Sequence, residues 1–280
     1  PAATAGARHR PVWQPKGFLE WQWELDHPLS LHSARDMGLD TRASNGDRPP
    51  RTVPKVFDID AVLNPASTIA ALHRRGDRAI CYVDVGTAGN YYTAAQEGIP
   101  RTYFAQLRAD GDLGHQLQGY PEYFIDITAR SAVRIVESMI ARQCARKHFD
   151  AVETDLDETF GTNEGVTGFP ITVADELHYL ETLAGYLHAR GLAWFAKNLD
   201  DTGRPAFIDA LAPFAQGVIT EQCNQFHTCS LLRPFLAAHK PVLDAEYYLP
   251  PARFCPADNA AGISGARFPL SLAGGRLPCR

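Results

Sequence analysis

The sequence predicts an α/β protein, a single-domain (β/α)8 TIM barrel in which parallel strands form an inner sheet covered by helices. Eight strand candidates alternate with helical or irregular segments along the 280 residues, and a barrel of this kind typically has about 250 residues. In addition, one strand candidate after another changes from apolar to polar residues at its end. The alternative is an open, doubly wound sheet, but no GxGxxG or GxxxxGK(S/T) motif follows a strand.

The strand candidates are short apolar or alternating runs. In the first, Trp21 and Trp23 share one face, as the two-residue period of a strand requires. The third is almost entirely apolar, which suits a parallel strand that is covered on both faces. The candidates are residues 19–25, 56–60, 79–86, 149–158, 193–198, 217–222, 241–247 and 267–272.

Helical spacing of apolar residues predicts the connecting helices. The clearest is 129–147, and Gly76 and Gly191 end two others in the manner of glycine caps. The predicted helices are 65–75, 129–147, 173–190, 204–214 and 231–239, with 252–262 as a weak connector. We expect 27–54 and 87–125 to be irregular, 1–12 to be a flexible N-terminal tail, and 13–280 to be the barrel domain.

Composition excludes several classes of protein. The net charge of −5, with both signs mixed along the chain, does not indicate a nucleic-acid surface. No apolar run reaches the roughly 18 residues of a membrane span. The chain has no CxxC or HExxH motif, and Phe160 occupies the position where a calcium loop starting at Asp155 needs glycine. We therefore expect a monomer with no nucleic-acid partner, no membrane partner, no metal and no cofactor.

Six cysteines allow three disulfides in 15 connectivities. Cys223 and Cys229 are close in sequence, as are Cys255 and Cys279, so we favour these two pairs and an exported, extracellular protein. The remaining two, Cys81 and Cys144, lie in apolar segments and either pair or remain buried thiols.

Polar residues cluster at the ends of successive strand candidates. In a parallel barrel these positions converge on the carboxyl-terminal mouth, where barrel enzymes place their chemistry. A single acidic strand end also fits a solvated loop, and Lys197 also fits a structural ion pair, but five such strand ends indicate one acidic pocket. The residues concerned are Asp84, Glu153, Asp155, Lys197, Asn198, Glu221, Asp244 and Glu246.

A pocket rich in carboxylates suits glycoside hydrolysis. One acid protonates the leaving oxygen, and a second carboxylate attacks the sugar or activates water. Neighbouring like charges keep one acid protonated, and Lys197 would keep the other ionised. Aromatic residues could stack on sugars, although packing in the core is the alternative for each. The candidates are Trp13, Tyr91, Tyr92, Tyr247 and Tyr248.

Taken together, these segments resemble glycoside hydrolase family 114, the endo-α-1,4-polygalactosaminidases and relatives. The resemblance extends from about Trp13 to Cys279, and the Glu-Gln-Cys-Asn-Gln run at Glu221, with Cys229 following, is its most specific part. The segments that carry it are 21–25, 56–60, 80–86, 149–157, 197–198, 221–226 and 246–247.

The resemblance implies a secreted, endo-acting (β/α)8 glycoside hydrolase that cleaves α-1,4 bonds in partly acetylated polygalactosamine or galactosaminogalactan. It implies that Asp155 and Glu221 are the catalytic carboxylates. We assign Asp155 as nucleophile and Glu221 as acid/base, with the reverse and the stereochemistry open. An acidic groove would attract the ammonium groups of this cationic polysaccharide. The expected substrate-binding residues are Asp58, Tyr82, Asp84, Glu153, Lys197, Asn198, Glu246 and Tyr247.

Two segments depart from the family pattern. The residues after Gly86 lack the acidic, Arg-containing run that is usual there, and 27–54 is longer than usual. Both belong to loops that would shape the mouth of the barrel. Two alternatives therefore stay open: a glycosidase of the same fold that acts on a different polysaccharide, and a non-catalytic carbohydrate-binding barrel.

Overall fold

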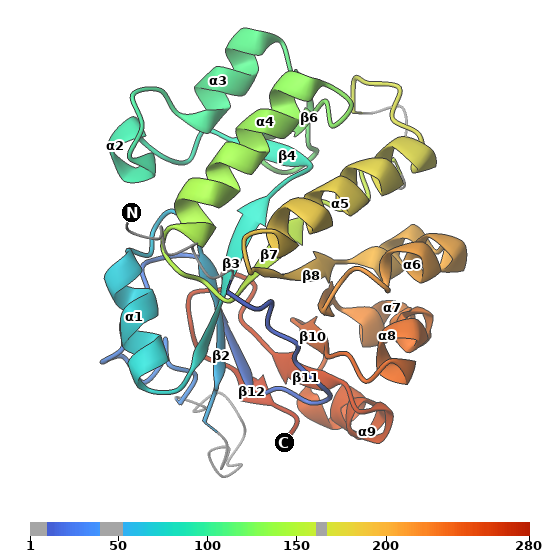
Figure 1. The fold of residues 1–280 in the computed structure, drawn as a ribbon. Coiled ribbons are helices and arrows are strands. Elements are labelled where there is room, and N and C mark those ends of the chain that lie inside the picture. Colours follow the sequence, from blue (N-terminus) through green and yellow to red (C-terminus); the bar gives the residue numbers. More distant parts are fainter. Residues whose placement is uncertain (1–9, 40–52, 161–166) are drawn as a thin grey trace, which may run out of the picture.

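A computed structural model of the chain describes residues 10–39, 53–160 and 167–280 (Figure 1). Within these residues, eight parallel strands follow one another around a curved sheet in chain order, which confirms the predicted barrel. A ninth strand, β12 (Leu277–Pro278), pairs antiparallel with the last of them. The parallel strands are β1 (Trp21–Glu24), β2 (Val56–Asp60), β3 (Arg78–Asp84), β7 (Ala151–Asp155), β8 (Ala193–Lys197), β9 (Gly217–Glu221), β10 (Val242–Glu246) and β11 (Ser264–Arg267).

Helices cover the outside of the sheet (Figure 1). In the described part of the chain, no helix combines the length and the apolar character that a membrane crossing requires. The helices that follow the barrel strands are α1 (Ala66–Arg74), α4 (Arg130–Met139), α5 (Val173–His188), α6 (Pro205–Leu211), α7 (Cys223–Phe226), α8 (Arg233–Ala237) and α9 (Pro251–Ala261). The shorter turns are the π-helix η1 (Ile140–Ala145) and the 3-10 helices η2 (Leu199–Thr202) and η3 (Cys229–Leu232).

The eighth strand is not where the sequence predicts it. It runs from Ser264 to Arg267 rather than over 267–272. The reason is close packing: a Cβ atom on Gly265 would lie 1.9 Å from a carboxylate oxygen of Asp258, so this strand carries small residues and lacks an apolar signal. Ser264, in the last parallel strand, also connects to the first strand region, because its Oγ accepts the N–H of Leu19 and its carbonyl accepts the indole N–H of Trp21.

The core has two layers. Alternate strand residues point into the barrel, where Trp21, Trp23 and Phe195 pack together with Ile219, as the predicted shared face of the two tryptophans requires. The other residues of each strand pack against the helices in a larger cluster. The sheet is therefore covered on both faces, which explains its continuous apolar runs.

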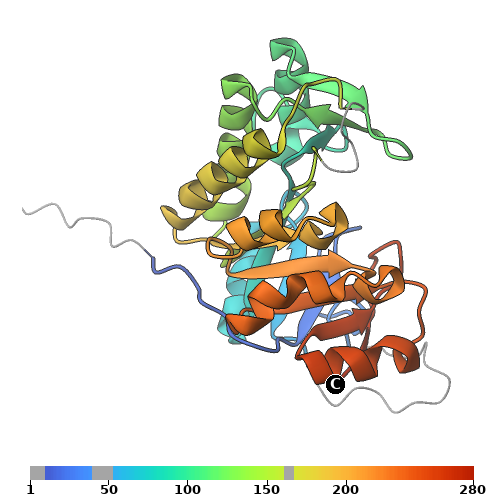
Figure 2. The same cartoon turned by 90° about the vertical axis from the view of Figure 1, so that its right-hand side faces the viewer.

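Residues 87–125 are more ordered than the sequence predicts. They form a three-stranded antiparallel sheet in the order β4-β6-β5, flanked by two helices. Because β4 follows β3 at once, this small sheet projects from the carboxyl end of the barrel strands (green in Figure 2). Strands of three or four residues are too short to give a periodic pattern. The elements are β4 (Thr87–Gly89), α2 (Ala94–Glu97), α3 (Tyr103–Asp110), β5 (Leu113–Gln116) and β6 (Glu122–Ile125).

The cysteines form three disulfides. The predicted pairs Cys223–Cys229 and Cys255–Cys279 are both present. The third, Cys81–Cys144, settles the alternative that the sequence left open and links β3 to the π-helix after α4.

The N-terminal segment runs along the end of the barrel opposite to the small sheet. Residues 1–9 of the predicted tail lie outside the described residues. Arg10 forms an ion pair with Asp150. Trp13 packs 5.8 Å from the ring of Phe195 and 5.9 Å from the guanidinium of Arg78, the first residue of β3. Trp13 therefore belongs to the amino-terminal end of the barrel, and packing, the alternative to stacking on sugars, describes its contacts.

Candidate active site

A pocket opens at the carboxyl ends of β3, β7, β8 and β9, where the sequence places its polar residues. Six of the ten predicted site residues line it: Tyr82, Asp155, Lys197, Asn198, Glu221 and Tyr247. The remaining lining residues are Trp23, Leu25, Leu117, Tyr120, Glu122, Leu156, Glu158, Leu270 and Leu272.

Lys197 lies at the centre of the pocket floor. Its side chain is only 2% exposed, and its ammonium nitrogen is 3.1 Å from Asp155, 3.2 Å from Glu153 and 3.3 Å from Glu221. Burial alone would lower the pKa of Lys197, but the charges of Asp155, Glu221 and Glu153 raise it well above its ordinary value. Lys197 therefore stays charged and holds three carboxylates within one ion-pair network, in which the buried Glu153 forms the structural ion pair that the sequence also allowed.

Asp155 is held from two sides. One oxygen accepts from Lys197, and the other accepts the hydroxyl proton of Tyr82 at 2.7 Å. The Tyr82 hydroxyl also lies 3.0 Å from Asp84. Burial, followed by the charges of Glu122 and Asp155, raises the pKa of Asp84 well above its ordinary value. A protonated Asp84 can donate to Tyr82 while Tyr82 donates to Asp155, which orients the Asp155 carboxylate.

Glu221 is clamped from the neighbouring strands. Its Oε2 accepts from the side-chain amide of Asn198 at 2.9 Å, and its Oε1 accepts from the hydroxyl of Tyr247. The Asn198 side chain in turn accepts the backbone N–H of Glu221 at 2.9 Å. Both carboxylates therefore point into the same pocket with fixed orientations.

The backbone turns sharply after each of these strands. Leu156, Asn198 and Gln222 follow β7, β8 and β9 and have φ angles of +62°, +46° and +60°. Residues with a side chain adopt this left-handed conformation at a cost of roughly 1–3 kcal/mol. Such conformations concentrate at functional sites, and here they redirect the chain directly after Asp155 and Glu221.

The other four predicted site residues, Asp58, Asp84, Glu153 and Glu246, do not line this pocket. Asp58 and Glu153 are fully buried. Burial, followed by the charge of Glu153, raises the pKa of Asp58 well above its ordinary value. Asp58 is therefore a buried neighbour of the Lys197 ion-pair network rather than part of the pocket lining. Glu246 is also buried and accepts the backbone N–H groups of Asn224 and Gln225. The geometry gives Glu246 a role in fixing the turn after β9 rather than a contact with substrate.

Sequence reasoning missed several pocket residues. Tyr120 and Glu122 come from the small sheet and its preceding turn, a segment that gave no periodic pattern. Leu270 and Leu272 were assigned to a strand. Glu158 belongs to the acidic run after β7, but nothing in the sequence distinguished it from the neighbouring acids as a pocket residue.

The predicted aromatic residues have different surroundings. Tyr91 is 47% exposed and donates to Glu122, whereas Tyr92 donates to Asp60. Tyr248 is 62% exposed and lines a groove that shares Tyr247 and Leu270 with the pocket.

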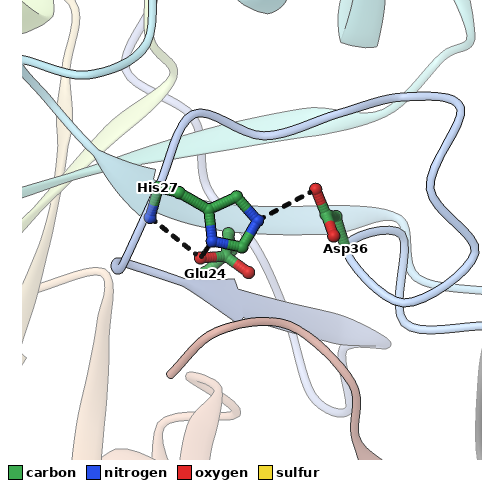
Figure 3. A group of neighbouring side chains, drawn as sticks. All are labelled: Glu24, His27 and Asp36. Carbon is green, nitrogen blue, oxygen red and sulfur yellow. Dashed lines mark hydrogen bonds and ion pairs between the residues drawn. The ribbon is translucent and has the colours of Figure 1, made fainter. Parts of the chain in front are cut away.

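One histidine lies between carboxylates outside the pocket (Figure 3). His27 Nδ1 is 3.2 Å from Glu24, and Nε2 is 3.3 Å from Asp36. Burial raises the pKa of Glu24 to about 7. Burial would lower the pKa of His27, but Glu24, Asp26 and Asp36 raise it. Because each ring nitrogen faces a different carboxylate, the arrangement fits an ion-paired imidazolium better than a ligand of one metal ion.

Comparison with known proteins gives a match over almost the entire chain. The sequence profile of glycoside-hydrolase family GH114 matches residues 2–277. No match was found among curated protein sequences.

Solved structures share the fold. The crystal structure of Aspergillus fumigatus Ega3 in complex with galactosamine is 24% identical, covers 98% of this chain and 100% of its own, and has a TM-score of 0.75. The glycoside hydrolase domain of PelA from Pseudomonas aeruginosa is 16% identical over 83% and 95%, with a TM-score of 0.57. The α-galactosidase TtGalA from Thermus thermophilus, in complex with p-nitrophenyl α-D-galactopyranoside, is 13% identical over 90% and 59%, with a TM-score of 0.52.

Proposed function

Because the chain belongs to glycoside-hydrolase family GH114 and is thus a glycoside hydrolase, we propose that it cleaves α-1,4-galactosaminidic bonds inside partly acetylated polygalactosamine. The observation that carries the proposal is the Lys197 network, which holds two carboxylates, Asp155 and Glu221, in fixed orientations in one pocket. The likeness to Ega3, whose structure was solved with galactosamine, supports the choice of sugar.

In this proposal Asp155 is the nucleophile and Glu221 the acid/base. Glu221 donates a proton to the glycosidic oxygen while Asp155 attacks the anomeric carbon, and Glu221 then removes a proton from the water that releases the sugar. Asp155 loses its charge when the ester bond forms, and Glu221 gains one. Lys197 contacts both, so at each stage it can pair with whichever carboxylate is charged.

The Lys197 contacts also bear on the stereochemistry. The ammonium is 3.1 Å from one carboxylate oxygen and 3.3 Å from the other, so these oxygens cannot be farther apart than the sum of the two distances. This limit applies to the two oxygens nearest the ammonium, and such an arrangement accommodates the roughly 5–5.5 Å between the carboxyl groups of retaining enzymes. We therefore propose retention of configuration, which proton NMR of the first-formed product tests.

Charge and disulfides support the remaining parts of the proposal. Asp155, Glu122 and Glu158 make the pocket wall acidic, which would attract a cationic polymer and do so less strongly at high salt. The three disulfides fit an extracellular protein. We propose residues 13–280 as the catalytic domain of a secreted monomer.

The test is hydrolysis of polygalactosamine by the wild type and by Asp155→Asn and Glu221→Gln. Each substitution should lower kcat on the order of 10³-fold or more, because each removes a group that reacts. Asp209→Asn and Glu181→Gln are matched controls on exposed positions of α6 and α5 and should keep full activity. Full activity in either pocket variant would refute the assignment.

A second substrate class is favoured by one observation. The segment after Gly86, which departs from the family pattern, builds the small sheet that brings Tyr120 and Glu122 to the pocket. Both residues would face a bound substrate, so a different polysaccharide is the alternative. Turnover of another glycan in a panel, without turnover of galactosamine polymers, would establish it.

A further inference from the structure

Glu158 is a pocket residue that the mechanism above does not use. It lies in the loop after β7 and is 7% exposed. It lines the same pocket as Asp155 and Glu221. Its Oε2 atom is buried and, within the part of the chain that the structure describes, accepts no hydrogen bond.

The surroundings of Glu158 are strongly acidic. Burial, followed by the charges of Asp155, Asp157, Asp201 and Glu176, raises the pKa of Glu158 well above its ordinary value. The nearby cation of the pocket, Lys197, is bound to three other carboxylates. The position thus combines a buried acceptor oxygen with a negative potential. Both favour the protonated acid in the free protein, and a positively charged donor beside Glu158 would lower its pKa and favour the carboxylate.

Glu158 differs in this respect from the other pocket acids. Both oxygens of Glu122 accept hydrogen bonds, one from Thr87 and one from Tyr91. Both oxygens of Asp155 and of Glu221 also have donors. Among the described acids that line this pocket, Glu158 is therefore the one with an oxygen that accepts no hydrogen bond from the protein.

We propose that Glu158 binds the ammonium group of a galactosamine unit and thereby selects deacetylated sugars. The proposal rests on the proposed function, since it concerns the same pocket. An ammonium group offers three donors and a full charge, and its contact with a carboxylate is a charge-assisted hydrogen bond. An N-acetyl group offers one uncharged N–H, and the hydroxyl of galactose offers one uncharged O–H.

The experiment compares the wild type with Glu158→Gln, which preserves size and removes the carboxyl group that the ammonium would hold in its charged form. Hydrogen bonds to charged groups contribute roughly 1.5–3 kcal/mol, so kcat/KM on fully deacetylated oligomers should fall about 10- to 100-fold. The same oligomers after chemical N-acetylation should show a change below about 3-fold, because no charged contact is lost. Glu181→Gln, the matched control on the exposed surface of α5, should change neither value.

A second measurement does not depend on hydrolysis. Isothermal titration with the monosaccharides galactosamine and galactose should show a preference for galactosamine in the wild type, and Glu158→Gln should abolish that preference. An equal loss on both oligomers would mean that Glu158 only supports the fold, and unchanged selectivity would equally overturn the proposal. A wild type that prefers galactosamine through Glu158 but cleaves no galactosamine polymer would refute the proposed function and leave this inference standing.

Discussion

Replacing Lys197 by methionine should destabilise the protein in a way that depends on pH. Lys197 is 2% exposed, Glu153 is fully buried, and Asp155 and Glu221 are 16% and 27% exposed. Removal of one partner from a buried ion pair costs roughly 3–5 kcal/mol, because the remaining charge is left uncompensated. Most of this cost comes from Glu153, since solvent partly screens the two exposed carboxylates.

The magnitude follows from the size of the protein. For a large domain, 1 kcal/mol corresponds to roughly 2–4 °C in Tm, so Lys197→Met should lower Tm by about 6–20 °C near pH 8. Burial already raises the folded-state pKa of Glu153 above its unfolded value, and loss of the lysine raises this pKa further, because the cation no longer offsets burial. A carboxylate whose folded pKa is raised stabilises the fold only when protonated. The loss relative to wild type should therefore be smaller at pH 5 than at pH 8.

Thermal and urea unfolding at both pH values provide the assay. Lys240→Met is the control, because the Lys240 ammonium donates to the backbone carbonyls of Ala212 and Ala215 rather than to a carboxylate. Its loss of stability should be the same at pH 5 and pH 8. Adding Glu153→Gln to Lys197→Met should recover part of the stability. A pH-independent loss, or a double variant less stable than Lys197→Met, would refute the reasoning.

Two further predictions concern stability. Burial raises the pKa of Glu24 to about 7, above its unfolded value of 4.5, so its stabilising contribution is present below pH 4.5 and is lost as pH rises through 7. The fall in unfolding free energy between pH 5 and pH 8 should therefore be smaller in Glu24→Gln than in wild type. An equal fall in both proteins would contradict this prediction. Replacing Cys81 and Cys144 together by alanine opens a loop of 63 residues and should lower the unfolding free energy by roughly 4 kcal/mol. This loss is about twice the effect expected from opening the six-residue loop between Cys223 and Cys229. Equal shifts of the two urea unfolding midpoints would refute the loop-length argument.

The barrel could be predicted because its strands are apolar and end in polar residues at equivalent positions. β2 matches the predicted 56–60, and the predicted 193–198 and 217–222 exceed β8 and β9 by one residue. The eighth strand was misplaced, because packing around Gly265 selects small residues that carry no hydrophobic pattern.

The pocket floor was more predictable than its walls. Asp155, Lys197 and Glu221 lie directly at strand ends, so alternation and barrel geometry bring them together. Tyr120 reaches the pocket through pairing within the small sheet, which depends on contacts between segments rather than on local periodicity. The two possibilities for Trp13 could not be separated from the sequence, since an aromatic side chain alone does not indicate which end of the barrel it occupies.

The disulfide between Cys81 and Cys144 encloses all of the small sheet and the helices α2, α3 and α4 in one covalent ring. The segment that supplies Tyr120 and Glu122 to the pocket is thus linked to the rest of the protein by the chain at both of its ends and by the disulfide that joins the two flanking segments. A protease that cuts once between residues 87 and 125 would leave a nicked chain whose two pieces remain joined until a reductant is added. In the secreted protein that we propose, such a ring would keep the two pieces together after a single cleavage by an extracellular protease.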